Sequence, residues 1–148
     1  MMTIDEQVDI LLVEDSAEEA AMATAAIKVR DFGQWLVHVI DVDQALALIC
    51  ATNVAANWRI KTAPKVIILD LELSRRGGIE LLQQLKAEER TRHIPVVVLT
   101  GSTDEREMLE RYRLGANSCV VKPVNSQQYT QMIGDIAHYW LTINHPFT

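Results

Sequence analysis

Acidic, hydroxyl and amine side chains follow four short apolar segments of the sequence, at the point where each segment ends. The residues concerned are Glu14 and Asp15 after the first segment, Asp70 after the third, Thr100 after the fourth and Lys122 after the fifth. If the segments are parallel strands, their carboxyl ends meet at one edge, where open α/β sheets bind ligands. We therefore expect three acids, a hydroxyl and an amine to share one cleft.

The three carboxylates need a compensating cation. Two carboxylates about 4 Å apart at an effective dielectric near 20 repel each other by about 4 kcal/mol. Oxygen ligands that leave room for water suit Mg²⁺, and the ammonium group of Lys122 adds compact positive charge. Beside such an ion, a carboxylate oxygen of Asp70 could attack a phosphoryl group and form an aspartyl phosphate, which the Thr100 hydroxyl could contact.

The apolar segments alternate with helical patterns along the chain. We predict strands over residues 9–13, 36–40, 65–69, 94–99 and 119–121. Alternating strands and helices are typical of an α/β fold with a parallel sheet, which joins its strands through helical crossovers.

Five helices are predicted between and after these strands. The first opens at Ser16, which has capping-box spacing with Glu19, and the next three cover residues 43–50, 78–88 and 103–114. In the fourth helix, Glu107 and Arg111 are spaced for an ion pair. The fifth has an apolar stripe of Tyr129, Met132, Ile133, Ile136, Ala137 and Trp140, so we expect it to pack on the sheet.

Composition is that of a soluble single domain, which we expect to span residues 1–148. Hydrophobic residues make up 49% and charged residues 23% of the 148 residues, as in ordinary globular proteins. The net charge of -6, without a Lys/Arg block, argues against nucleic-acid and membrane-surface binding. Two cysteines without metal-ligand spacing indicate reduced thiols, and no signal peptide or membrane span is visible, so we expect a cytoplasmic location.

The motifs "LLVEDS", "VIILDLEL…GG", "VVVLTGS" and "CVVKPV" resemble, in order and spacing, those of the receiver domain of bacterial two-component response regulators. The resemblance covers nearly the whole chain. It implies a doubly wound, flavodoxin-like (βα)5 fold with strand order 2-1-3-4-5. It also implies a phosphoacceptor that catalyses only its own phosphorylation and dephosphorylation, not an enzyme acting on other substrates.

The resemblance assigns a role to each site residue. Asp70 would be phosphorylated by a sensor histidine kinase, and Thr100 and Lys122 would contact the phosphoryl group. Mg²⁺ would be held by Glu14, Asp15, Asp70 and the backbone carbonyl of Glu72. The resemblance also implies a cis peptide bond before Pro123.

A narrower resemblance concerns the single-domain regulators that pair with bacterial phytochromes. It is carried by the long connection at residues 51–64, the "NSCVVKPVN" run and the terminal "HYWL". By itself, that connection reads either as an extension of the second helix or as a partner-facing loop. The subgroup lacks an effector domain and can form homodimers through helix four, strand five and helix five, which implies a homodimer for this chain as well.

Three positions depart from the common receiver pattern. Cys119 stands at the switch position, where the family usually has Tyr or Phe, and a thiol cannot fill the volume of a ring. Ser74 stands where the loop after the acceptor usually has Pro, and Glu72 adds a carboxylate that could repel or orient the hydrolytic water. We interpret Cys119 as a small buried residue in preference to a redox sensor.

Two other functions remain open from the sequence. A pseudo-receiver would keep the fold and bind partners independently of phosphorylation, as Cys119 and Ser74 could suggest. An enzyme on a similar sheet would want a D-x-D pattern for a phosphatase, or a glycine- and hydroxyl-rich phosphate loop for a flavin protein. The chain has Glu14-Asp15 in place of the first and lacks the second.

Overall fold

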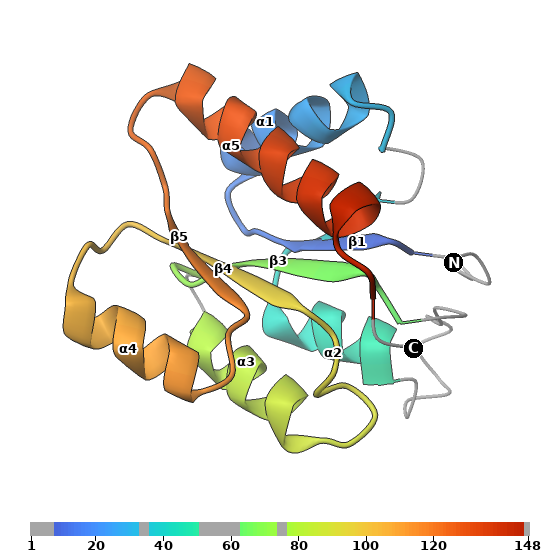
Figure 1. Ribbon diagram of the computed structural model, residues 1–148, viewed down its shortest axis with the longest axis vertical. Helices are drawn as coiled ribbons and strands as arrows, with labels where there is room; N and C mark the ends of the chain where they lie inside the picture. Colours follow the sequence, from blue (N-terminus) through green and yellow to red (C-terminus); the bar gives the residue numbers. More distant parts are fainter. Residues whose placement is uncertain (1–7, 33–35, 51–62, 74–76, 147–148) are drawn as a thin grey trace.

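The computed structural model describes residues 8–32, 36–50, 63–73 and 77–146. Five strands alternate with five α-helices, and a short π-helix follows the last of them (Figure 1). In chain order the elements are β1 (Ile10–Val13), α1 (Ala17–Val29), β2 (Leu36–Val39), α2 (Val42–Cys50), β3 (Val66–Asp70), α3 (Gly78–Ala87), β4 (Val96–Thr100), α4 (Glu105–Arg113), β5 (Ser118–Val121), α5 (Ser126–His138) and η3 (Tyr139–Ile143). The expected alternation is confirmed.

The predicted strand and helix bounds are close to the observed ones. The fourth strand begins at Val96, two residues later than predicted, because Pro95 has no N–H for the sheet ladder. The third strand includes Asp70 as its last residue. The predicted long connection lies mostly outside the described residues, and so does Ser74.

All strands are parallel, in the order β2-β1-β3-β4-β5, as the resemblance implied. The register pairs Val13 with Leu69, and it pairs Thr100 with Val121. Because neighbouring strands run in one direction, their last residues lie at one edge of the sheet. The register therefore brings the candidate site residues to that edge.

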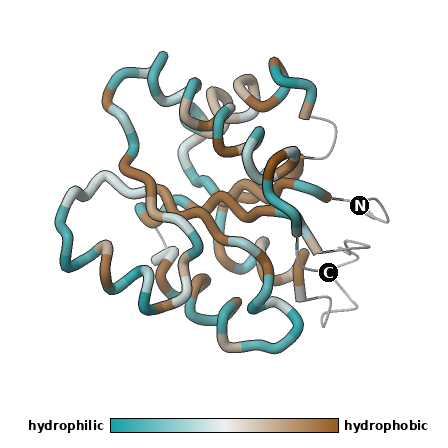
Figure 2. Tube along the Cα trace, viewed as in Figure 1, coloured by the Kyte–Doolittle hydropathy of each residue, from teal (hydrophilic) through white to brown (hydrophobic). Residues whose placement is uncertain are grey.

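Helices cover both faces of the sheet, with α1 and α5 on one face and α2, α3 and α4 on the other (Figure 1). The strands between them are the most hydrophobic part of the chain (Figure 2). β3 and β4 are buried at every position, as expected for central strands covered on both faces. This covering places the carboxylate of Asp70 at the end of a fully buried strand.

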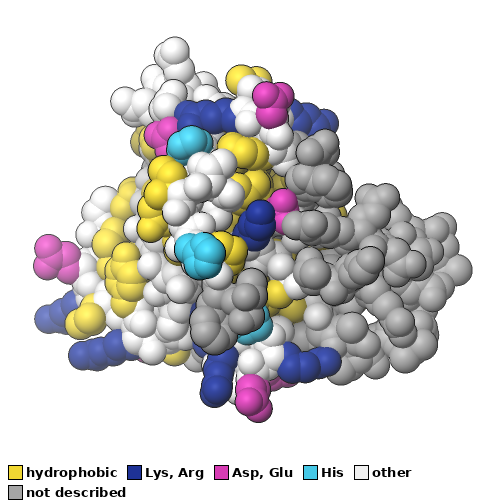
Figure 3. All heavy atoms as spheres, turned by 45° about the vertical axis from the view of Figure 1, so that its right-hand side comes forward, with side chains coloured by type: hydrophobic (Ala, Val, Ile, Leu, Met, Phe, Trp, Pro, Cys, Tyr) yellow, Lys and Arg dark blue, Asp and Glu magenta, His cyan; other side chains and the backbone are white. Residues whose placement is uncertain are grey.

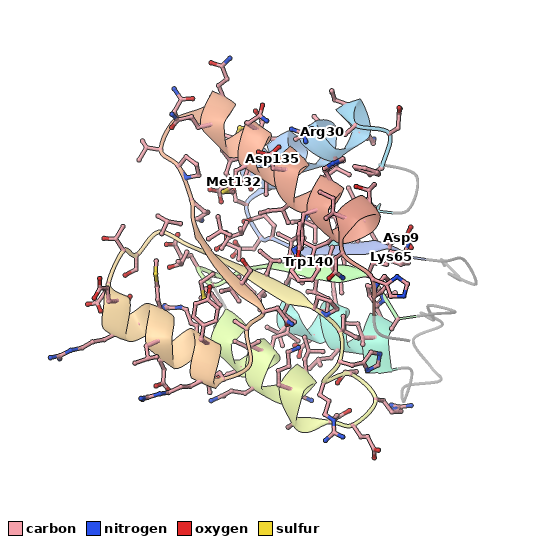
Figure 4. All side chains as sticks on the ribbon, viewed as in Figure 1. Asp9, Arg30, Lys65, Met132, Asp135 and Trp140 are labelled. Carbon is pink, nitrogen blue, oxygen red and sulfur yellow. The ribbon has the colours of Figure 1, made fainter. Side chains whose placement is uncertain are left out.

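The apolar stripe predicted on the fifth helix packs as expected. Tyr129, Ile133 and Ala137 are buried with the α1 residues Ala23 and Ile27 against one face of the sheet. Met132, Ile136 and Trp140 are partly buried against the same cluster. At the protein surface, an ion pair between Arg30 Nη2 and Asp135 Oδ1, 2.8 Å apart, joins the end of α1 to α5 (Figure 4).

A hydrogen-bond network closes the edge of the sheet opposite the site. Lys86 Nζ donates to the carbonyl oxygens of Arg92 (3.0 Å) and Ile94 (2.7 Å) and to Asn117 Oδ1 (3.1 Å). Asn117 Oδ1 also accepts from the N–H of Val96 at 2.9 Å. Burial lowers the pKa of Lys86. The network joins α3 to the starts of β4 and β5.

No peptide bond between described residues is cis. The prediction of a cis peptide bond before Pro123 was therefore wrong. Among the helices of the described ranges, none has the length and apolar character needed to span a membrane.

Candidate functional site

The ends of β1, β3 and β4 place three site residues at one edge of the sheet. Asp70 and Thr100 are the last residues of β3 and β4 and are each only 2% exposed. Glu14 directly follows β1, and its N–H donates to the carbonyl oxygen of Val39 at the end of β2. The backbone of all three residues therefore belongs to the sheet or extends it, while their side chains lie at its carboxyl edge.

Lys122 lies at the centre of the site. Its ammonium nitrogen Nζ is 3.1 Å from Asp70 Oδ2, 3.2 Å from Glu72 Oε2 and 3.5 Å from Glu19 Oε1. Its backbone N–H donates to the carbonyl oxygen of Thr100 at 2.7 Å, which fixes its position after β5. Burial alone would lower the pKa of Lys122, but the hydrogen bonds with Asp70 and Glu72 outweigh it and raise the pKa. Lys122 is therefore charged.

Three acids could hold a metal ion together. Ligand oxygens of Glu14, Glu19 and Asp70 all lie within 4.8 Å of one another. Asp15, which the sequence predicted as a ligand, is not in this group, so its role stays a prediction. Glu14 is fully buried, and its Oε2 has no hydrogen-bond partner among the described residues. Three converging carboxylates, one of them with an unpartnered buried oxygen, suit a divalent cation with oxygen ligands.

The electrostatics of Glu14 supports the same conclusion. Burial, followed by its contact with Asp70, raises the pKa of Glu14 to about 9. Burial and the neighbouring Asp70 therefore favour the protonated form of the Glu14 carboxyl. A cation at this site would favour the deprotonated form, because it binds a carboxylate.

Glu19 is the site residue that the sequence reasoning missed. Its N–H donates to Ser16 Oγ at 3.2 Å, as the capping-box spacing predicted. The reciprocal bond is absent, because the Ser16 N–H donates instead to Glu14 Oε1 at 3.0 Å. The Glu19 carboxylate thus turns to Lys122 and the acids. The sequence could have indicated Glu19, because Glu19 lies in the first turn of the helix after β1. That turn lies over the strand ends.

The Thr100 side chain is held by the loop that leads to α4. Its hydroxyl oxygen accepts from the N–H of Ser102 at 3.0 Å. Two residues later, Asp104 caps α4 by accepting from the N–H groups of Arg106 and Glu107. A movement of the Thr100 hydroxyl would therefore shift the loop backbone that leads into α4.

Glu72 contacts the site through both its backbone and its side chain. Its N–H donates to Asp70 Oδ1 at 2.8 Å. Its carboxylate accepts from the N–H of Gly101 at 2.9 Å through Oε1 and from Lys122 through Oε2. The side chain thus bridges the loops after β3 and β4 to Lys122. The carbonyl role implied for Glu72 at the metal stays a prediction.

Cys119 lies on β5, half-buried against the cluster formed by α2, α3 and the sheet. Its backbone N–H donates to the hydroxyl oxygen of Tyr112 on α4 at 3.1 Å. Burial raises the pKa of the thiol, although Arg111 and Tyr112 oppose the shift. A neutral, packed thiol agrees with a structural residue, and the aromatic ring beside this position comes from α4.

Comparisons with known proteins agree with this geometry. Residues 10–134 match the model of the response regulator receiver domain. The chain is 33% identical over 135 residues to the probable methanogenesis regulatory protein FilR2 of Methanothrix harundinacea, covering 91% of this chain and 84% of the relative. It is 30% identical over 132 residues to the response regulator Rcp1 of Synechocystis, covering 89% and 88%.

Solved structures show the same similarity. The phosphorylated cyanobacterial phytochrome response regulator RcpA has a TM-score of 0.83 at 28% identity, with 98% of this chain and 99% of RcpA covered. The Mn²⁺-bound form of Rcp1 has a TM-score of 0.83 at 29% identity, with 94% and 98% covered. The fold, and not only the motifs, is therefore shared.

Proposed function

Because the chain belongs to the family of response regulator receiver domains, we propose that it accepts a phosphoryl group on Asp70 from a sensor histidine kinase. Mg²⁺ would be bound by Glu14, Glu19 and Asp70, whose oxygens already converge. The observation that carries the proposal is the 3.1 Å contact between Lys122 Nζ and Asp70 Oδ2 beside these acids. This contact places the positive charge of Lys122 beside the Asp70 carboxylate that would attack phosphorus.

In the transfer, an Asp70 carboxylate oxygen forms a bond to phosphorus while the bond from phosphorus to the imidazole nitrogen of a phosphohistidine breaks. The bonding electron pair leaves with that nitrogen. Mg²⁺, when bound, neutralises charge on the transferring oxygens. Lys122 does the same from the protein side, and the Glu72 N–H holds the other oxygen of Asp70 in place.

The phosphorylated state would then be transmitted through the Thr100 loop. The Thr100 hydroxyl donates to a new phosphoryl oxygen and gives up its contact with the Ser102 N–H. Because this loop leads into α4, the change reaches the surface of α4, β5 and α5. Cys119 occupies the usual switch position on β5, so in this chain the coupling would run through the loop and through the hydrogen bond from the Cys119 N–H to the Tyr112 hydroxyl.

The similarity to RcpA, a phytochrome response regulator, supports a kinase of the phytochrome type, which would act on this protein in the cytoplasm. The chain covers nearly all of RcpA. We therefore propose that residues 1–148 form one receiver domain.

The test is phosphoryl uptake from acetyl phosphate in the presence of Mg²⁺. We expect intact-protein mass spectrometry to show one added phosphoryl group, and treatment with EDTA before the donor to prevent it. Hydroxylamine should remove the label, since it cleaves acyl phosphates and leaves serine and threonine phosphoesters intact. A protein that takes up no label, yet binds its partner equally well with or without Mg²⁺, would instead be a pseudo-receiver.

We also propose that two copies associate through α4, β5 and α5. β5 is an edge strand, and a groove of about 540 Å³ beside it includes Val120, Met132, Ile136, Tyr139 and Trp140. Hydrophobic side chains also gather on one side of the face that Figure 3 shows. Sedimentation velocity is expected to show a dimer with beryllium fluoride and Mg²⁺. A monomer both with and without them would refute this interface.

A further inference from the structure

We propose that the Glu72 carboxylate is an internal competitor of the phosphoryl group. In the unphosphorylated protein it bridges the N–H of Gly101 and Lys122 Nζ. Lys122 Nζ also contacts Asp70 Oδ2, and Gly101 directly follows Thr100 at the same edge of the sheet. An aspartyl phosphate on Asp70 would therefore compete with Glu72 for these donors. This inference rests on the proposed function and adds a regulatory contact to it.

Lys122 has no N–H left for a phosphoryl oxygen. An ammonium group has three N–H donors, and Lys122 Nζ contacts three carboxylates, those of Asp70, Glu72 and Glu19. A phosphoryl oxygen would therefore compete with these carboxylates for the three N–H donors of Lys122.

Burial identifies Glu72 as the carboxylate that leaves. The Asp70 side chain is 2% exposed and that of Glu19 is 31% exposed, whereas that of Glu72 is 55% exposed. Moving a half-exposed carboxylate into water restores its hydration at little cost, whereas a buried one would have to cross the packed site. Asp70 itself is the acceptor and stays.

The second donor, the N–H of Gly101, can be approached closely by the Glu72 carboxylate because Gly101 has no side chain. A Cβ on Gly101 would lie only 2.5 Å from Glu72 Oε1, so the absence of a side chain at this position permits the hydrogen bond. The amide is the first after Thr100, whose hydroxyl belongs to the same loop. Release of Glu72 therefore frees the Thr100 loop and Lys122 together.

The competition also has an electrostatic part. A phosphoryl group brings about two negative charges to a position that already has the Glu72 carboxylate nearby. Glu72 Oε2 and Asp70 Oδ2 both contact Lys122 Nζ, at 3.2 and 3.1 Å. Like charges gathered around one nitrogen repel even in a high effective dielectric, so the Glu72 carboxylate disfavours the phosphorylated state until it moves away.

The inference predicts that Glu72→Gln speeds phosphorylation. Loss of a charge-assisted hydrogen bond to Lys122 is expected to raise the initial rate of labelling by acetyl phosphate with Mg²⁺ roughly tenfold at low salt. Glu89→Gln is the matched control, because Glu89 is exposed in the loop between α3 and β4, at the opposite edge of the sheet. It should label at the wild-type rate.

A second variant separates competition from simple charge removal. Gly101→Ala keeps the charge of Glu72 but displaces its carboxylate by the close contact of the added Cβ. We expect it to label faster than wild type as well. A direct readout is the amide signal of Gly101 in ¹H–¹⁵N spectra, which should shift in Glu72→Gln and, in the wild type, on addition of beryllium fluoride with Mg²⁺.

The outcomes separate the two proposals. If wild type takes up no label, the proposed function fails, and the Gly101 amide signal still tests the contact with Glu72. If wild type is labelled but Glu72→Gln or Gly101→Ala is labelled no faster, the competition is refuted while the proposed function stands. A Gly101 signal that does not respond to Glu72→Gln would also refute the inference.

Discussion

Asp70→Asn is expected to take up no phosphoryl group from acetyl phosphate under conditions that fully label the wild type. The asparagine side chain has the shape of aspartate, but its neutral amide lacks the anionic oxygen that attacks phosphorus. The variant also loses one of the three converging carboxylates, so it should bind Mg²⁺ more weakly. Intact-protein mass spectrometry and Mg²⁺ titration by calorimetry measure the two effects.

The fold of Asp70→Asn should be preserved. The amide oxygen can still accept from the Glu72 N–H, as Asp70 Oδ1 does, and circular dichroism checks this point. Asp31→Asn is a suitable control, since Asp31 is exposed and has a φ of 66°, which asparagine adopts readily. The control should label fully. Label on Asp70→Asn that is equal to wild type would assign the phosphoryl group to another residue and contradict the proposed acceptor.

Lys122→Ala is expected to lower the free energy of unfolding of the metal-free protein by about 3 kcal/mol. The lysine is buried to 10% exposure of its side chain and compensates Asp70, Glu72 and Glu19. Without it, Asp70 keeps a buried charge that has lost its cation. Urea denaturation in EDTA, compared with wild type, measures the loss.

Mg²⁺ should restore much of the stability lost in Lys122→Ala. The ion binds the folded site and replaces the missing positive charge, so stability rises with its concentration. Lys65→Ala is the control, because Lys65 Nζ lies 4.0 Å from Asp9 at the other end of the molecule (Figure 4). Any loss of stability in Lys65→Ala should not be reversed by Mg²⁺. If Mg²⁺ rescues neither variant, the acids do not form the metal site.

The loss in Lys122→Ala should be larger at pH 8 than at pH 5. Burial and the neighbouring Asp70 raise the pKa of Glu14, and loss of the nearby ammonium group of Lys122 adds to this rise. The folded state then binds more protons than the unfolded state above the ordinary carboxyl pKa. Stability therefore falls as the pH rises. Equal losses at both pH values would contradict an electrostatic origin.

The family resemblance and strand alternation predicted which residues converge, because parallel strands end at one edge. Asp70, Thr100 and Lys122 each directly end or follow an apolar segment, so their relative placement follows from strand direction and register alone. The packing of the helix stripe with Tyr129 and Ile133 was also predicted from the sequence, since a periodicity of 3.6 residues identifies the helix face that packs.

The sequence by itself thus determined the fold class and the edge of the sheet where Asp70 and Lys122, the proposed acceptor and its lysine, lie together. Only the tertiary structure decided that Glu19 joins Glu14 and Asp70, that Glu72 bridges Lys122 and Gly101, and that Tyr112 reaches the backbone of Cys119. The physical reason is that strand ends are positioned by backbone hydrogen bonds within the sheet. These other contacts join side chains to groups on different helices and loops, whose meeting depends on packing and rotamers that no local spacing encodes.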